Sequence, residues 1–245
     1  MKQDIDTAIR GWEYKPGIPQ ARLVQAGSGR QVIQLRVDLG ILQIETADRP
    51  DGTRPHGHAT YFDYLKQQAR MADRGGRSFG LSEEQCEEAD REFVQYYHRR
   101  ICWLTLRNYS RAIADADHTL AFMNFIRDHS PSEEYAQAHE QYRGFVLFHR
   151  TQAAAAEAAD RNDGETAIDA LRDGLSRMRD FFATYDAEEQ MEEDGMVQEL
   201  RRMEKTLRQK FSIDATLQEQ LDEAVAKEDY NLAARLRDQL RSKQV

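Results

Sequence analysis

The most concentrated set of chemically capable side chains lies in one short loop, RPDGTRPHGH, at residues 49 to 58. Its candidate ligand-binding residues are Arg49, Asp51, Arg54, His56 and His58. Arginine binds carboxylates and phosphates through paired hydrogen bonds, so the loop is a possible anion- or peptide-binding site. The two histidines could begin a metal site, but such a site needs a third ligand and none follows nearby. The alternative is a charged Pro-Gly loop in which Asp51 stabilises its own turn.

Other residues capable of catalysis are scattered along the chain. Asp115 and His118 are three residues apart on a predicted helix, but a di-iron bundle needs two such pairs and two further glutamates. The sequence has no second good pair, and it has no GxSxG, HExxH or GxxxxGK[ST] pattern. We therefore expect no catalytic residue, no metal and no cofactor, and a protein that is not an enzyme.

Composition narrows the classes of partner. Charged residues make up 31% of the chain and the net charge is −9, which argues against direct nucleic-acid binding. The two cysteines, Cys86 and Cys102, form no CxxC pair, a pattern typical of the reducing cytoplasm. No apolar run approaches the roughly 20 residues that span a bilayer, and the first residues lack an apolar signal-peptide core. We expect a cytoplasmic protein without membrane contacts.

The N-terminal part, residues 1–75, differs from the rest of the chain. The segments ARLVQA and RQVIQLRVDL flank a Gly-Ser-Gly turn and predict a β-hairpin. Apolar residues alternate with polar ones from Ile33 to Ile41, and Leu39 belongs to that series, so one long strand is expected with Gly40 at a bulge or bend. The loop at 49–58 and a helix beginning near Tyr61 complete this unit.

Residues 82–185 predict a body of antiparallel helices. Ser82 and Gln85 form a capping box before a long helix, and Ser130 with Pro131 and Glu133 predicts the start of a third helix that runs to about residue 160. The second and fourth helices carry related lettering, NYSRAIADADHTL and DGETAIDALRDGL, which resembles the second helix of a tetratricopeptide repeat (TPR). The copies are 55 residues apart rather than about 34, and Arg100 stands where that family has a small residue. An ordinary antiparallel bundle is the alternative.

Residues 186–213 combine the acidic run DAEEQMEEDG with the basic run RRMEKTLRQK. Charge runs of this kind are usually solvated helix faces. Leu200, Met203, Leu207 and Phe211 supply a narrow apolar stripe between the charges. We expect a charged connecting helix.

Two short amphipathic segments make up residues 214–243. In the first, Leu217, Leu221, Ala224 and Val225 share one face, and in the second, leucines recur every four residues from Leu232. The two arms together bury too little surface for an independent domain. The predicted helical hairpin must therefore dock on the body or pair with another hairpin.

The spacing of the hairpin residues resembles the UVR motif, the interaction hairpin of UvrB and UvrC, which is also similar to segments of McsA-type activators and ClpC-type chaperones. The resemblance covers roughly residues 214 to 243, with Asn231 where the family usually has Glu and Leu221 where it often has Met. It implies an antiparallel contact with a second such hairpin. The implied contact residues are Leu221, Ala224, Tyr230, Ala233, Ala234, Leu236 and Leu240, with Arg237 and Asp238 as polar partners.

The N-terminal segment VDLGILQIE followed by RPDGTRPHG also resembles the start of bacterial UVR-domain proteins, a likeness that brings no activity with it. The predicted fold is mainly α, with an N-terminal β-hairpin unit, an antiparallel TPR-like bundle and a C-terminal two-helix UVR-like hairpin. The leading hypothesis is a scaffold or adaptor that uses the hairpin for dimerisation or docking on a foreign protein. The alternatives are an accessory factor in nucleotide excision DNA repair, and a ligand-binding protein or enzyme centred on the 49–58 loop.

Overall fold

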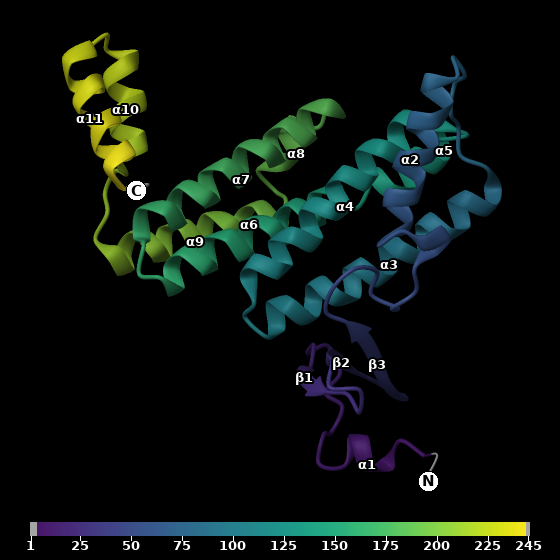
Figure 1. The fold of residues 1–245 in the computed structure, drawn as a ribbon. Helices are drawn as coiled ribbons and strands as arrows, with labels where there is room; N and C mark the ends of the chain where they lie inside the picture. Colours follow the sequence, from purple (N-terminus) through teal and green to yellow (C-terminus); the bar gives the residue numbers. More distant parts are fainter. Residues whose placement is uncertain (1–3, 244–245) are drawn as a thin grey trace. The chain divides into compact units, whose positions relative to one another are not determined.

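A computed structural model describes residues 4–243 of the chain (Figure 1). Contacts within the chain group it into two compact units, with the boundary between Val146 and Leu147. This division is coarser than the four predicted segments. Within residues 4–243, every helix is too short or too polar to cross a membrane.

A small antiparallel sheet opens the first unit, and its first two strands form the predicted hairpin. Leu23 lies opposite Ile33 in that pair, and Val32, Ile33 and Leu35 are buried on the middle strand. The elements of this part are α1 (Asp6–Ile9), β1 (Ala21–Gln25), β2 (Gln31–Val37) and β3 (Gly40–Glu45).

The expectation of one long strand through Ile41 is wrong. Strand β2 ends at Val37, and the chain turns back through Asp38 and Leu39 so that Val37 pairs with Gly40 at the start of β3. Leu39 sits in this turn and is 94% exposed. The Arg36 guanidinium holds the turn by donating to the Gly40 carbonyl at 2.9 Å. The hairpin is therefore extended by a third strand.

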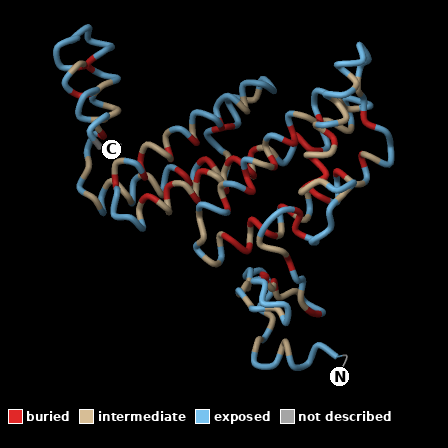
Figure 2. Tube along the Cα trace, in the orientation of Figure 1, coloured by how far each residue is buried: buried red, intermediate tan, exposed pale blue. Residues whose placement is uncertain are grey.

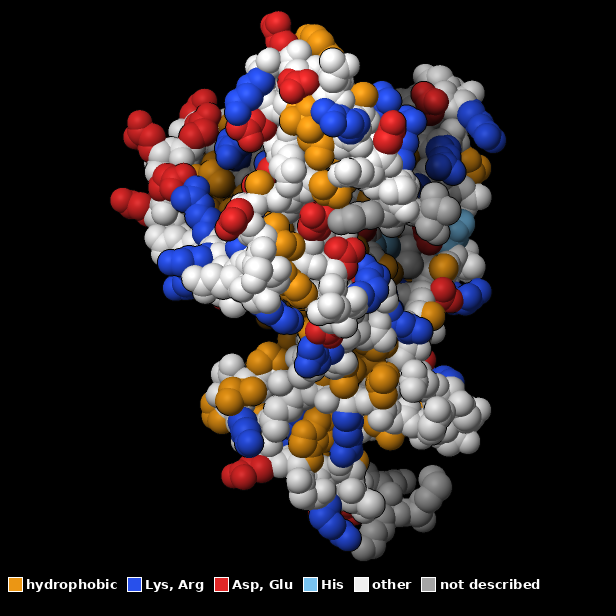
Figure 3. Space-filling view, turned by 90° about the vertical axis from the view of Figure 1, so that its left-hand side faces the viewer, with side chains coloured by type: hydrophobic (Ala, Val, Ile, Leu, Met, Phe, Trp, Pro, Cys, Tyr) orange, Lys and Arg blue, Asp and Glu red, His pale blue; other side chains and the backbone are white. Residues whose placement is uncertain are grey.

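Several apolar side chains of the sheet region are exposed. Leu23 and Leu42 are partly exposed on the outer strands, Leu39 is exposed in the β2–β3 turn, and Ile18 is exposed in the segment before β1. Figure 3 shows hydrophobic side chains on the surface of this part of the chain, at the bottom of the view.

The helical part of the first unit follows a loop and a short 3-10 turn. Thr60 caps the first long helix by accepting a hydrogen bond from the Asp63 backbone, and Ser82 and Gln85 form the predicted capping box of the next. These elements are η1 (Pro55–Gly57), α2 (Tyr61–Arg74), α3 (Glu83–Thr105) and α4 (Tyr109–His129).

The core of this unit lies between α2, α3 and α4. Phe122 stacks on Phe62 and on Phe93, with ring centroids 4.6 Å apart in both pairs, and Leu65 and Ile126 are fully buried beside them. Figure 2 shows the buried residues on the inward sides of these helices. An aromatic core of this kind fixes how the three helices pack.

The predicted third helix is divided in two. Ser132, rather than Ser130, is the cap of α5 (Glu133–Glu140), because its side chain accepts from the Tyr135 backbone. The chain then turns at residues 141–142 before α6 (Arg143–Asp160) begins. The first residues of α6 belong to the first unit and the rest to the second.

Glycines allow close helix packing in the second unit. A Cβ atom at Gly174 would lie 2.1 Å from the Thr151 hydroxyl on α6, and one at Gly164 would lie 2.4 Å from the Phe211 ring. The helices that follow α6 are α7 (Gly164–Thr184), α8 (Glu188–Met191) and α9 (Gly195–Phe211).

The predicted charged connector contains α8 and α9, and α9 packs on α7. Val197 and Leu200 are fully buried, so this segment has a real apolar seam beneath its charged face. The chain ends in the predicted hairpin, formed by α10 (Leu217–Ala226) and α11 (Tyr230–Lys243). The mainly α fold with a small N-terminal sheet and a C-terminal helix pair is thus confirmed, whereas the likeness to a TPR stays a prediction.

Candidate functional site

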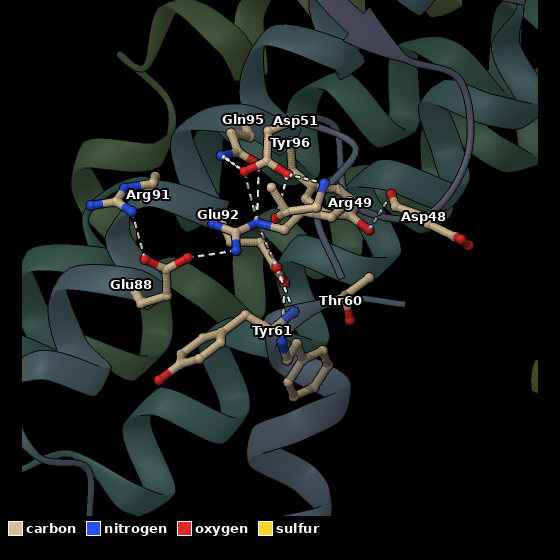
Figure 4. A network of polar contacts seen from close by, with 12 residues as sticks. Asp48, Arg49, Asp51, Thr60, Tyr61, Glu88, Arg91, Glu92, Gln95 and Tyr96 are labelled. Carbon is tan, nitrogen blue, oxygen red and sulfur yellow. Dashed lines mark hydrogen bonds and ion pairs between the residues drawn. The ribbon is translucent and has the colours of Figure 1, made fainter. Parts of the chain in front are cut away.

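Arg49, the first residue of the predicted ligand loop, is directed into the protein (Figure 4). Its side chain is only 3% exposed and lies among carboxylates from the loop and from α3. Nη1 is 2.5 Å from the Glu88 carboxylate, and Nε is 3.4 Å from Asp51 and 3.6 Å from Glu92. Nε also donates to the Gln95 side chain at 3.3 Å. The arginine charge is therefore balanced by internal groups.

Glu92 joins this arginine to the start of α2. The Glu92 carboxylate is fully buried and accepts the backbone N–H groups of Tyr61 at 2.6 Å and Phe62 at 3.1 Å. Helix N-terminal N–H groups lack partners within the helix and carry partial positive charge, so a buried carboxylate is stabilised there. The His118 ring, stacked on Tyr96, completes the cluster with Nε2 3.3 Å from Glu92.

Asp51 stabilises its own loop, as the alternative interpretation of the sequence held. Burial alone would raise the pKa of Asp51, but hydrogen bonds from Thr53 and Gln95 and the charge of Arg49 lower the pKa below its ordinary value. Oδ1 accepts from the Thr53 backbone at 2.8 Å, and Oδ2 from the Gln95 amide at 2.9 Å. The carboxylate is therefore ionised and fully engaged.

The other predicted loop residues make separate contacts, although Arg54 and His56 line one pocket together with Arg49. Arg54 is exposed and pairs with Asp48 at 2.6 Å. His56 has a left-handed backbone and stacks on Tyr64 at 4.0 Å, while the His58 ring lies 5.8 Å from the same tyrosine. Of the five predicted residues only Arg49 is buried, whereas Asp51, Arg54 and His56 are exposed and His58 is half-buried. Anion or peptide binding by the loop stays a prediction. Residues 4–243 contain no cluster of three or more potential metal ligands.

The Asp115 and His118 pair is used structurally. Asp115 accepts two hydrogen bonds from Arg99, at 2.8 and 2.9 Å, and both side chains are buried. Arg99 Nη1 also donates to the Asp48 carbonyl at 2.8 Å, which fixes the end of the sheet to α3. Sequence reasoning missed this role because the partners are remote along the chain.

The C-terminal hairpin has a small core of its own. Ala224 on α10 packs against Ala233 and Leu236 on α11, and Leu217 and Leu221 cover the edge of this cluster. Three of the predicted contact residues, Ala224, Ala233 and Leu236, are therefore buried between the two arms. They hold the arms together instead of facing outward.

Polar contacts fasten the first turn of the hairpin to α7 and α9. Thr216 is fully buried, caps α10, and donates its hydroxyl hydrogen to Asp169 on α7 at 2.8 Å. Glu219 lies 2.6 Å from Arg208 on α9 and 3.4 Å from Arg172 on α7. Burial raises the pKa of Asp169 above its ordinary value. Burial would also raise the pKa of Glu219, but the hydrogen bonds that Arg208 donates to Glu219 outweigh this effect and lower its pKa.

The opposite end of the hairpin carries exposed apolar side chains. Tyr230 is 68% exposed and Val225 is 52% exposed, and they flank the connection between the arms, with Leu232 partly exposed two residues further on. Val225, Tyr230 and Leu232 together form the tip patch. Only Tyr230 of this patch was among the predicted contact residues, although the apolar periodicity of both arms marks the other two.

Most of the remaining predicted contact residues lie on α11, and one lies on α10. Ala234 and Leu240 are partly buried, and Leu221 is partly buried on α10. Arg237 and Asp238 are exposed and contact each other at 3.3 Å. The Arg237–Asp238 pair and the tip patch are therefore both exposed on the hairpin.

Residues 215–244 match the family model described as the UvrB/uvrC motif, which is the segment that forms α10 and α11 together with the Thr216 cap. No curated protein and no solved structure matches the chain. The chain is therefore a UVR-motif-containing protein. In UvrB and UvrC this motif mediates contact between proteins.

Proposed function

We propose that this protein is a non-enzymatic scaffold or adaptor, and that its hairpin pairs with a second UVR-type hairpin on another copy or on a foreign protein. The observation that carries the proposal is the tip patch, in which Tyr230 and Val225 lie exposed within the UvrB/uvrC motif. Tyrosine is among the residue types that dominate the energetics of protein interfaces.

The structure of the hairpin supports pairing on physical grounds. Its internal core depends on two alanines and one leucine, Ala224, Ala233 and Leu236, so the arms bury little apolar area against each other. A second hairpin would cover the exposed patch and add the burial that two short arms lack. The hydrogen bond from Thr216 to Asp169 attaches the N-terminal end of α10 to α7, whereas the tip patch lies at the C-terminal end of α10.

Two further features support the adaptor role. The inward charges of the 49–58 loop balance one another, which favours a structural use of Arg49 and Asp51 over catalysis. Cys86 and Cys102 are both free and buried, as expected for a cytoplasmic protein. A role in excision repair would follow if the foreign partner were itself a UvrB- or UvrC-type protein.

The test is the solution mass of the full chain, measured by light scattering over a range of concentrations. The variant Tyr230→Glu places a charge in the tip patch, and the control Gln239→Glu places the same charge on an exposed position of α11 outside it. We expect Tyr230→Glu to weaken dimerisation by about tenfold or more, as for a central aromatic contact, and Gln239→Glu to leave it unchanged.

If the wild-type chain stays monomeric, binding to a hairpin of a foreign protein is measured instead. Purified UvrB is then the probe, with the same two variants. The proposal would be refuted if the wild-type chain formed neither a dimer nor a complex with UvrB. It would also be refuted if Tyr230→Glu and Gln239→Glu had the same affinity for the partner hairpin.

A further inference from the structure

A cavity of about 750 Å³ lies in the first unit, lined by residues of α3, α4, α5 and the first turn of α6. Its lining is mostly apolar and aromatic, and it includes Phe93, Tyr97, Met123, Tyr142 and Phe145. Cavities of a few hundred to about 1,000 Å³ with such linings are typical binding sites for small molecules. None of the tip-patch residues lines this cavity.

One lining residue does not fit an apolar cavity. Arg100 is 2% exposed, and it is fixed by a hydrogen bond from Nη1 to the Thr119 hydroxyl at 3.1 Å. Its Nε atom has no hydrogen-bond partner, and within residues 4–243 no carboxylate lies within ion-pair distance of its guanidinium. Buried charges are normally paired, because removing a charge from water is costly.

The neighbouring acids do not supply that partner. Asp115 is engaged by Arg99 through both carboxylate oxygens. Asp90, which also lines the cavity, accepts the Tyr135 hydroxyl at 2.6 Å and contacts His139 at 3.0 Å. Burial lowers the pKa of Arg100 to about 10, so the guanidinium is still charged at neutral pH. The cavity therefore combines an apolar body with one positive charge that, within residues 4–243, has no carboxylate in direct contact.

We propose that this cavity binds a small carboxylic acid with an apolar tail, the carboxylate on the Arg100 guanidinium and the tail among the aromatic side chains. The guanidinium fork matches a carboxylate, and a charged acceptor gives the stronger class of hydrogen bond. Thr119 acts as the positioning residue, since its hydroxyl accepts from Arg100 and donates to the Asp115 carbonyl at 2.7 Å.

The test compares two probes by isothermal titration calorimetry on the full chain. Decanoate offers the tail and the carboxylate, and decan-1-ol offers the same tail without charge. We expect decanoate to bind at least about tenfold more tightly than decan-1-ol, because only the acid meets the charge. The variant Arg100→Met should remove that preference while leaving the binding of decan-1-ol in place.

A second variant protects the test against a fold defect at Arg100. Ala138 lines the cavity and is exposed, so Ala138→Trp should fold normally and obstruct the space, weakening both probes. Gln137 is exposed and does not belong to the lining, so Gln137→Trp is the matched control and should bind as wild type does. Equal affinity for the two probes, no binding of decanoate, or an Ala138→Trp variant that binds normally would each overturn the proposal. If decanoate does not bind, and if the wild-type chain self-associates in solution while the Ala138→Trp variant does not, the cavity would instead be assigned to protein contact.

Discussion

Replacing Arg49 with glutamine should destabilise the first unit strongly, whereas the same change at Arg54 in the same loop should not. Arg49 is 3% exposed among Glu88, Asp51 and Glu92, and its loss leaves the fully buried Glu92 without its cation. Breaking a buried ion pair by removing one partner costs about 3–5 kcal/mol. Glu88 and Asp51 are partly solvated, so the lower end, about 3 kcal/mol, is expected here.

The control has the same charge change in a different setting. Arg54 is 64% exposed and pairs with Asp48 alone. Exposed pairs are worth about 0–1 kcal/mol, so Arg54→Gln should lower the melting temperature by a few degrees at most. Arg49→Gln should lower it by about 6–12 °C, taking about 2–4 °C per kcal/mol for a domain of this size.

The assay is thermal and urea unfolding followed by circular dichroism, with both variants measured beside the wild type. A double-mutant cycle with Glu92→Gln should give a coupling energy of about 1 kcal/mol or more, because the two side chains share one network. Equal melting temperatures for Arg49→Gln and Arg54→Gln would refute the assignment of Arg49 as a structural residue. The 49–58 loop would then be open again as an anion site.

Three further outcomes are expected. Gly174→Ala should destabilise the second unit by about 1–3 kcal/mol in urea unfolding, because the new methyl group would overlap the buried Thr151 side chain, while Gly195→Ala, which has open space, should be nearly neutral. The pKa of Glu219 is lowered, so its ion pairs stabilise the protein fully above its ordinary pKa of 4.5, and this stabilisation is lost as the pH falls below 4.5. Glu219→Gln should therefore reduce the dependence of the unfolding free energy on pH in this range. Burial raises the pKa of Cys102 to about 12, so Ellman's reagent at pH 8 should leave this thiol unmodified until urea unfolds the chain.

Local signals in the sequence were enough for most of the elements. The capping box at Ser82 and Gln85 is formed as predicted, because both of its hydrogen bonds are made within four residues. The C-terminal hairpin was also predictable, since the apolar positions of its arms follow the helical period and its short connection leaves one way to pair them. Helix caps and apolar periodicity depend only on residues that are close together in the sequence, so they can be recognised without the structure.

The polar–apolar alternation predicted a strand across a turn, because the turn residues continue the same alternation. Asp38 and Leu39 continue the polar–apolar pattern of β2, so nothing in the pattern marks the reversal that places Leu39 in solvent. The positive φ of Asp48 and His56 and the division of the third helix at residues 141–142 were likewise invisible to periodicity.

The buried charges could not be predicted because their partners are distant in sequence. Arg49 meets Glu92, which lies 43 positions further along the chain, and Arg99 meets Asp115 on the following helix. Arg100 is the exception: it stood out in the sequence as a large cation where a TPR helix has a small residue. That misfit marks the position that the structure places at the apolar cavity.

The double use of Glu92 also affects how the first unit opens. One carboxylate holds the amide groups of Tyr61 and Phe62, the Arg49 loop and α3, so α2 cannot unwind from its first turn without exposing a buried charge. First turns of helices normally fray and exchange their amide hydrogens rapidly. We therefore expect these two amides to exchange slowly, and the loop, α2 and α3 to open together.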